Sequence, residues 1–164
     1  MEKEENHLPI YGPGPVFGGV VAVLTLGAFL MRNAPFLAAG QLSGGWRTLF
    51  IVLGAICILT GIALWVYAVP ISKIDDGILG NHLVTTGAYA LVRNPIYSAI
   101  MIICIGVLLI AGNLYFLVLP FLYWFFLTIL LKNTEEKWLR NLYGQEYEAY
   151  CRRVNRCWPW IPKQ

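Results

Sequence analysis

Charged residues are scarce in this sequence, and four long stretches lack them altogether. Only 13% of the 164 residues are Asp, Glu, Lys or Arg, whereas ordinary soluble domains contain roughly 25%. The uncharged stretches are Val16–Met31, Thr48–Val69, Ile96–Ala111 and Leu114–Leu131. A membrane span needs ~20 apolar residues, with about 17 as the lower limit. The second and fourth stretches reach that length, so the sequence predicts an integral membrane protein.

The residue patterns of several familiar sites are also missing. The four cysteines form no CxxC pair and have no neighbouring histidine, which argues against a zinc site or a disulfide framework. His7 and His82 are isolated in loops. Gly12 and Gly14 follow no strand and alternate with prolines, so they do not form a dinucleotide-binding loop. No predicted span contains an acid or a base, which argues against a proton-coupled transporter. We expect neither a metal site nor a nucleic-acid partner.

Proline precedes both of the shorter uncharged stretches. Pro15 and Pro95 can each add a residue to the first turn of a helix, where the missing N–H costs nothing. The first stretch also differs from a secretory signal peptide, because three acids and one lysine precede it and no A-x-A-like site follows it. We therefore expect all four stretches to be retained as spans.

The run from Asn94 to Leu131 contains 38 uncharged residues. One helix of that length would reach about 57 Å, roughly twice the ~30 Å hydrocarbon thickness. Gly112 and Asn113 tolerate the left-handed conformation that ends a helix, so the break is predicted there. The short connection predicts an antiparallel helical hairpin. Pro120 is expected to kink the second helix unless neighbouring groups satisfy the freed carbonyl.

The fold class that follows is all-α, a polytopic membrane helix bundle in one domain. After the last span, apolar residues recur at helical spacing on both sides of Gly144, which suits a helix end. The domain would cover residues 1–164, with an N-terminal two-helix part at 1–83 and a second part at 84–164. The four membrane helices are predicted near residues 15–31, 47–70, 95–111 and 114–132, followed by a helical C-terminal segment and without a sheet.

The distribution of basic residues orients this bundle. With four spans, both termini lie on one side, and ten of the twelve Lys and Arg residues lie there too. Only Arg32 and Arg47 lie on the other side. The positive-inside rule then predicts that both termini are cytoplasmic. The ten residues are Lys3, Lys73, Arg93, Lys132, Lys137, Arg140, Arg152, Arg153, Arg156 and Lys163.

Polar and titratable side chains lie immediately before and after the predicted hairpin. GAYALVRNPIY (Gly87–Tyr97) precedes it, and NTEEKWLRNLYGQEYEAYCRRVNRCWP (Asn133–Pro159) follows it. Because a hairpin returns the chain to the surface from which it started, these segments are expected to meet there. Such an arrangement is typical of a site for a polar cofactor at the lipid boundary.

The same residues carry a family resemblance. The order G-A-Y-A-L-V-R-N-P-I-Y, helical hairpin, E-E-x-x-L, Y-G-x-E-Y-x-x-Y resembles the isoprenylcysteine carboxyl methyltransferase family. It is similar also to the related phospholipid N-methyltransferases, and it covers roughly residues 84–160. The resemblance implies a methyltransferase that binds S-adenosylmethionine at the cytoplasmic end of the bundle. It implies cofactor-pocket roles for an R-H-P-x-Y motif, which here reads Arg93, Asn94, Pro95 and Tyr97, and for the paired glutamates, Glu135 and Glu136.

The chemistry of the donor agrees with these positions. Arg93 could bind its carboxylate through a charge-assisted fork, and Glu135 or Glu136 could bind its ammonium or ribose hydroxyls. Tyrosines could supply aromatic faces and hydroxyls to it. Asn94 replaces the family histidine and cannot ionise near neutral pH, which weakens any acid–base role there. The tyrosines are Tyr89, Tyr97 and Tyr147.

Other roles remain open for the charged residues. Arg93 could simply be a positive flank of a span, and Asn133 with Glu136 three residues later resembles a helix capping box. We assign no catalytic residue. The acceptor is expected to be a lipophilic or lipid-attached molecule with a carboxylate, amine or thiol. The alternative of another class is a non-catalytic four-helix membrane subunit.

Overall fold

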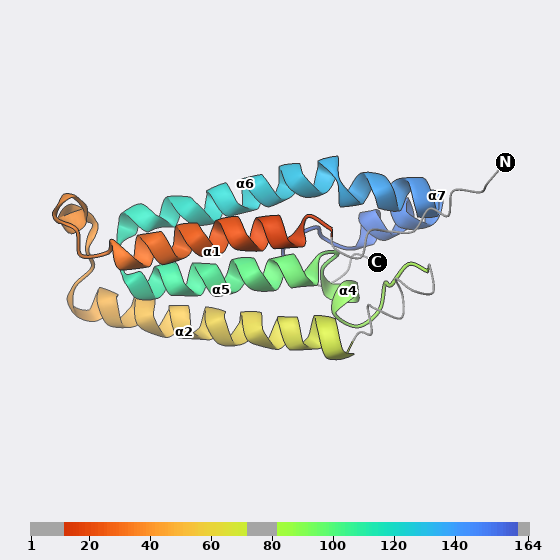
Figure 1. The fold of residues 1–164 in the computed structure, drawn as a ribbon. Coiled ribbons are helices and arrows are strands. Elements are labelled where there is room, and N and C mark those ends of the chain that lie inside the picture. The colour runs from red at the N-terminus through yellow and green to blue at the C-terminus, as the bar shows by residue number, and fades with distance from the viewer. Residues whose placement is uncertain (1–11, 72–81, 161–164) are drawn as a thin grey trace.

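The computed structural model describes residues 12–71 and 82–160, which are helical for most of their length (Figure 1). Within these residues there is no strand, and one isolated bridge joins Gln41 to Asn113. The predicted all-helical fold is therefore confirmed. The elements are α1 (Gly14–Leu30), η1 (Pro35–Gly40), α2 (Gly44–Val66), η2 (Tyr67–Ile71), α4 (Ala88–Leu91), α5 (Pro95–Ala111), η3 (Leu114–Leu117), α6 (Val118–Asn133) and α7 (Glu135–Arg153).

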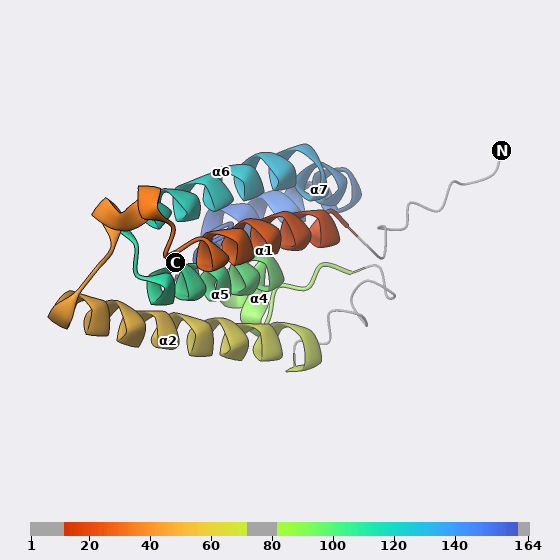
Figure 2. The same ribbon diagram turned by 60° about the vertical axis from the view of Figure 1, so that its left-hand side comes forward.

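Helix α5 is the core of the bundle. It packs against α1, α2 and α6, and both views show the four long helices running along one common direction (Figures 1 and 2). Nine of its 17 residues are buried, whereas α1, α2 and α6 bury three residues each. The other helices thus cover α5, and its two ends are fixed relative to all of them.

Glycines bring α2 and α5 into close contact. A Cβ atom on Gly54 of α2 would lie 2.6 Å from the carbonyl oxygen of Gly106 on α5. A Cβ atom on Gly61 would lie 2.9 Å from the carbonyl oxygen of Ala99. Small residues at helix interfaces are typical of membrane proteins, because they let backbones approach and gain van der Waals contact. This interface joins the two parts that the sequence predicts on either side of residue 84.

The hairpin breaks where the sequence predicts. Helix α5 ends at Ala111, and Gly112 adopts the left-handed conformation with φ 67° and ψ 41°. The side-chain oxygen of Asn113 accepts a hydrogen bond from the Tyr115 N–H at 3.1 Å. Pro120 lies in the first turn of α6, where no N–H is needed, and the 3₁₀ turn η3 precedes it. A change of helix type therefore precedes Pro120.

The outer surface of the bundle is apolar. Val23 on α1, Leu59 on α2 and Phe121 on α6 are strongly exposed, at 71%, 68% and 72%. Two segments, Gly44–Val69 and Leu114–Asn133, are long and apolar enough to cross a membrane. Only 17% and 22% of their most apolar windows are buried, which is far below what a soluble core helix requires. These surfaces are suited to contact with lipid.

Helix α7 bends sharply at Gly144. This residue has φ 50° and ψ −121°, a conformation that residues with a Cβ atom rarely adopt. The helix resumes beyond it, so Tyr147 and Tyr150 lie on a second helical stretch and are buried. The predicted helix end at Gly144 therefore corresponds to a bend between two stretches of one element.

Candidate functional site

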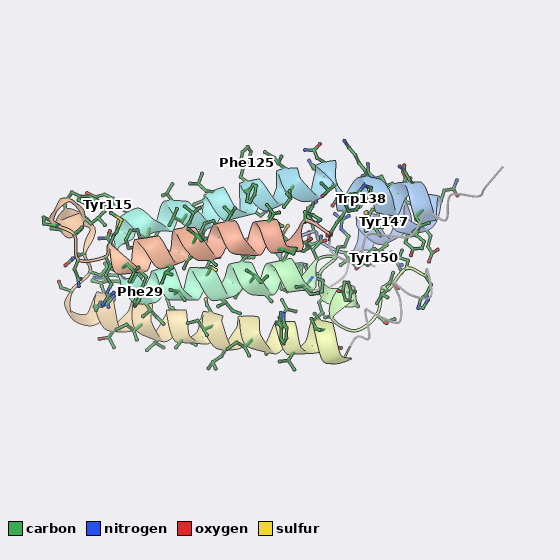
Figure 3. All side chains as sticks on the ribbon, viewed as in Figure 1. Phe29, Tyr115, Phe125, Trp138, Tyr147 and Tyr150 are labelled. Carbon is green, nitrogen blue, oxygen red and sulfur yellow. The ribbon has the colours of Figure 1, made fainter. Side chains whose placement is uncertain are left out.

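The structure brings the predicted site residues to one end of the bundle. This end is formed by the start of α1 and α5, by α4 and by the junction of α6 and α7 (Figure 1). Figure 3 shows Tyr147 and Tyr150 there, whereas Phe29 and Tyr115 lie at the opposite end. The predicted residues are Tyr89 on α4, Arg93 and Asn94 between α4 and α5, Tyr97 in the first turn of α5, Glu135 and Glu136 in the first turn of α7, and Tyr147 beyond its bend.

Glu136 lies between two arginines. Arg156 donates from Nε to Oε1 at 2.5 Å and from Nη2 to Oε2 at 3.0 Å, and Nη1 of Arg93 lies 3.3 Å from Oε1. Burial alone would raise the pKa of Glu136. The hydrogen bond from Arg156 and the charges of Arg93, Arg156 and Arg140 outweigh burial and lower that pKa below its ordinary value. Glu136 is therefore ionised, and its carboxylate is fully engaged within the protein.

Arg93 is held from several sides but keeps one free donor. Its Nη1 donates to the hydroxyl of Tyr147 at 3.4 Å and to the sulfur of Cys151, and its guanidinium carbon lies 6.0 Å from the centre of the Tyr147 ring. Its Nε is buried and has no hydrogen-bond partner among the described residues. Leaving a buried donor unsatisfied costs about 1–3 kcal/mol. A bound acceptor at this Nε would recover that cost.

Glu135 has a different environment from its neighbour. The Tyr97 hydroxyl donates a hydrogen bond to its Oε1, and no Lys or Arg of residues 12–71 and 82–160 forms an ion pair with it. Burial raises the pKa of Glu135; the hydrogen bond from Tyr97 opposes that rise, and the charge of Glu136 adds to it. The negative charge of Glu135 thus lacks a cationic partner in the described structure.

The start of α1 lies against the Tyr97–Glu135 pair. A Cβ atom on Gly12 would clash with Oε1 of Glu135, and one on Gly14 would lie 3.5 Å from the Tyr97 hydroxyl. Gly12 thus lies close to the end of the Glu135 side chain, whereas Gly14 lies at ordinary contact distance from Tyr97.

A C-terminal strap, residues 154–160, returns along α4 and the start of α5. Two backbone bonds connect it, from the Arg93 N–H to the Asn155 carbonyl at 2.8 Å and from the Trp160 N–H to the Leu91 carbonyl at 3.1 Å. Side-chain bonds add to them. Asn94 Nδ2 donates to the Arg156 carbonyl at 3.0 Å, and Ser98 Oγ donates to the Cys157 carbonyl at 2.6 Å.

Two buried groups complete this end of the bundle. The Tyr150 hydroxyl donates to the Tyr89 carbonyl at 2.6 Å, so α4 and the second stretch of α7 are joined directly. Burial raises the pKa of the Cys157 thiol to about 11, which keeps it neutral. Burial likewise raises the pKa of Tyr147 and of Tyr150, so both hydroxyls keep their protons.

The capping box considered for Glu136 is not observed, although Glu135 and Glu136 both lie in the first turn of α7, where negative charge suits the helix dipole. The residue before α7 is Thr134, which makes no side-chain cap, and Asn133 instead donates to the Ile129 carbonyl at 2.9 Å. Glu136 is therefore not part of a capping box. The Arg93 side chain is only 8% exposed, so Arg93 packs within the cluster at this end of the bundle.

Sequence reasoning overlooked Arg156 and the strap that carries it. The sequence places Arg156 only among the basic residues predicted to be cytoplasmic, because its partner Glu136 lies 20 residues away along the chain. The signal that could have revealed it is weak: one further arginine close to a region rich in tyrosine and glutamate.

Comparisons with known proteins identify the family of this chain. The phospholipid methyltransferase family matches residues 48–146, more than half of the chain. Protein-S-isoprenylcysteine O-methyltransferase of Schizosaccharomyces pombe is 36% identical over 81 residues, which are 49% of this chain and 34% of that relative. The chain thus matches about a third of the length of this relative, and no solved structure matches it. The chain belongs to the phospholipid methyltransferase family, and the predicted membership in this group of membrane methyltransferases is confirmed.

Proposed function

We propose that this protein is an S-adenosylmethionine-dependent integral-membrane methyltransferase that acts on a lipophilic acceptor, similar to the isoprenylcysteine carboxyl O-methyltransferases. Family membership supports the reaction class. The observation that carries the proposal is the buried Nε of Arg93, which has no hydrogen-bond partner in the described structure. At the same end of the bundle, Glu135 forms no ion pair with a Lys or Arg of the described residues. The Nε–H of Arg93 is thus available to an anionic ligand group, and the carboxylate of Glu135 is available to a cationic one.

These leftover groups suit the polar end of S-adenosylmethionine. Arg93 would bind its carboxylate, because an arginine N–H to a carboxylate is a strong, charge-assisted bond. Glu135 would bind its ammonium, or the ribose hydroxyls. Tyr147, which lies beside Arg93, and Tyr89 on α4 would contact the adenine base or the sulfonium. Asn94 donates to the strap in this chain, so we assign it a structural part in the cofactor site rather than acid–base work.

When bound, the cofactor supplies an electrophilic methyl group for direct transfer to a nucleophile. The chain's own residues would align the two reactants and exclude water. The strap covers the part of the cluster at Arg93, and the start of α1 covers the part at Tyr97 and Glu135, which serves that exclusion. A carboxylate acceptor arrives ionised and needs no base. An amine or a thiol must lose a proton to a basic group of the cluster or to water.

We further propose that four helices, α1, α2, α5 and α6 with η3, span the membrane as one domain over residues 1–164. Both termini would be cytoplasmic. The close α2–α5 packing supports a single unit. Among the described basic residues, Arg32 and Arg47 lie at the end opposite the site, as the positive-inside rule requires. Lys3, Lys73 and Lys163 of the predicted cytoplasmic set lie outside the described residues.

The acceptor class is proposed from the position of the site. The cluster lies at the end of a lipid-exposed bundle, so a molecule dissolved in the bilayer can approach it sideways between helices. The fission yeast relative is named for protein-S-isoprenylcysteine, which supports a carboxylate on a lipid-attached residue. A phospholipid amine is the second candidate, because the matching family is that of the phospholipid methyltransferases. A small thiol is the third.

Two measurements test the proposal. Calorimetry on detergent-purified protein should detect binding of S-adenosylhomocysteine, and membranes given labelled donor should methylate one of three acceptors: prenylcysteine analogues, phosphatidylethanolamine or small thiols. A folded protein that binds no S-adenosylhomocysteine would favour the rival class, a non-catalytic membrane subunit. Binding with transfer only to soluble protein or nucleic acid would refute the membrane acceptor and leave the methyltransferase standing.

A further inference from the structure

We propose that Arg156 is a positioning residue for the cofactor: by occupying both oxygens of Glu136, it leaves the guanidinium of Arg93 able to bind an anionic ligand group. This inference rests on the proposed function and goes beyond it, because it assigns a role to a residue in the strap. Neither the family resemblance nor the comparisons single out this residue.

The geometry of Glu136 is the first support. Arg156 makes two hydrogen bonds to it, at 2.5 and 3.0 Å, one to each oxygen. Arg93 makes a looser approach of 3.3 Å to a single oxygen. In the described structure these are the two arginines that form ion pairs with Glu136. If Arg156 were removed, Arg93 would become the main cation for a buried carboxylate and would be drawn onto it.

The charge of the cluster is the second support. Three cations, Arg93, Arg140 and Arg156, act on Glu136. Glu135 is adjacent, so the cluster carries one net positive charge when both glutamates are ionised. That surplus suits a bound carboxylate. Without Arg156 the net charge of the cluster is zero, so a carboxylate ligand would have to compete with Glu136 for Arg93. Competition between anions for one buried guanidinium is costly, because the losing charge is left desolvated and unpaired.

The strap explains why Arg156 can hold this position. Its own carbonyl accepts a hydrogen bond from Asn94, and the residues on either side are bonded to Arg93 and Ser98 through their carbonyls. The main chain at Arg156 is therefore anchored to the start of α5. A planar, two-point contact between arginine and carboxylate requires an anchored main chain, and a lysine cannot make that contact.

Substitutions at Arg156 and Glu136 test the inference through S-adenosylhomocysteine binding. Arg156→Gln should weaken binding roughly tenfold or more. Arg153→Gln is the matched control, because Arg153 is exposed, lies three residues away and carries the same charge; it should bind within about threefold of wild type. Arg156→Lys, which keeps the charge but loses the two-point contact, should be intermediate.

The decisive comparison is a double substitution. If Arg156 acts by neutralising Glu136, adding Arg156→Gln to the Glu136→Gln variant should lower the affinity for S-adenosylhomocysteine by less than about threefold. Lowering the pH from about 7 to about 5 should also recover binding in Arg156→Gln relative to wild type, because protonated Glu136 releases Arg93. A purely structural arginine would give neither the rescue nor the pH effect.

The outcomes separate the two proposals. If wild type does not bind S-adenosylhomocysteine, the proposed function fails. If wild type binds and Arg156→Gln matches Arg153→Gln, only the role of Arg156 is refuted. Equal losses from Arg156→Gln with and without Glu136→Gln would also refute it, and would point to direct contact with the ligand. Should Arg156→Gln fail to fold, Arg156→Lys is compared in the same two backgrounds with the same criteria.

Discussion

The hydroxyl of Tyr97, in the first turn of α5, donates a hydrogen bond to Oε1 of Glu135, at the start of α7. The two residues are 38 positions apart, at the two ends of the apolar hairpin. This bond is the direct evidence that the hairpin closes on itself at the level of the polar motifs. It also gives the two adjacent glutamates different surroundings, since Glu136 is bonded to arginines instead.

Removal of the tyrosine hydroxyl should weaken cofactor binding. In Tyr97→Phe, Glu135 loses a hydrogen bond that opposes the rise of its pKa, so its carboxylate is protonated over a wider pH range. The loss of affinity should therefore grow as pH falls, because a protonated Glu135 no longer attracts the ammonium group of the cofactor. Calorimetry with S-adenosylhomocysteine across pH should show this loss. The pH at which half of the affinity is lost should be higher for Tyr97→Phe than for wild type. Tyr115→Phe, at the opposite end, should change neither.

The two glutamates should affect stability in opposite directions near neutral pH. The pKa of Glu136 is lowered from 4.5, so its ionised form stabilises the fold above that value, and the stabilisation is lost as pH falls through the folded-state pKa. The pKa of Glu135 is raised from 4.5, so its ionisation destabilises the fold, and the penalty disappears as pH falls.

Thermal unfolding in detergent checks this difference. At about pH 7, Glu136→Gln should lower the unfolding temperature and Glu135→Gln should raise it, and both effects should shrink towards about pH 4. Glu148→Gln, exposed on the same helix, should have little effect. Changes of the same sign for Glu135→Gln and Glu136→Gln would contradict the environments described for them.

Substitution of Arg93 tests its free donor. Arg93→Lys keeps the positive charge beside Glu136 but lacks the Nε–H group that has no partner in the described structure. We expect Arg93→Lys to lose S-adenosylhomocysteine binding nearly as strongly as Arg93→Ala, by about ten- to a hundredfold. Arg140→Lys, an exposed neighbour of Glu136, is the control. If Arg93→Lys bound like wild type, only the charge at residue 93 would matter.

Glycine contacts between α2 and α5 should be essential for stability. Gly106→Ala would place a Cβ atom 2.6 Å from the Gly54 carbonyl oxygen, and backbone there cannot give way easily. We expect destabilisation by about 1–3 kcal/mol, the usual cost of overpacking. Gly19→Ala, on α1 with open space around it, should instead be neutral or slightly stabilising. Unfolding curves in detergent would show the contrast, and similar curves for the two variants would argue against close packing.

Thiol labelling in intact vesicles should check the proposed topology. Phe36→Cys in η1 and Arg153→Cys at the end of α7 are exposed positions at opposite ends of the bundle. A membrane-impermeant reagent should reach one of them from outside and the other only after the vesicles are opened, with the unsubstituted protein as background. Labelling of both from the same side would be incompatible with four spans.

The helices and the hairpin could be predicted because they depend on local signals. Uncharged runs gave the helix positions to within a few residues, and Gly112 and Gly144 marked the conformations that only glycine adopts readily. The network around Glu136 could not be predicted in the same way. It depends on where the strap crosses α5, which is set by hydrogen bonds from Asn94 and Ser98 to distant carbonyls. Such bonds leave no periodic trace in the sequence.

The length of α5 has a consequence for how this protein would sit in lipid. Its 17 residues span only about 26 Å, a few ångströms less than the ~30 Å hydrocarbon layer. The polar cluster that begins directly before Pro95 would therefore be drawn below the headgroup level, or the surrounding bilayer would thin to meet it. Such hydrophobic mismatch brings the reactive group of a membrane-dissolved acceptor to the cofactor without its leaving the acyl chains. Turnover should consequently depend on bilayer thickness, with shorter-chain lipids supporting the faster reaction.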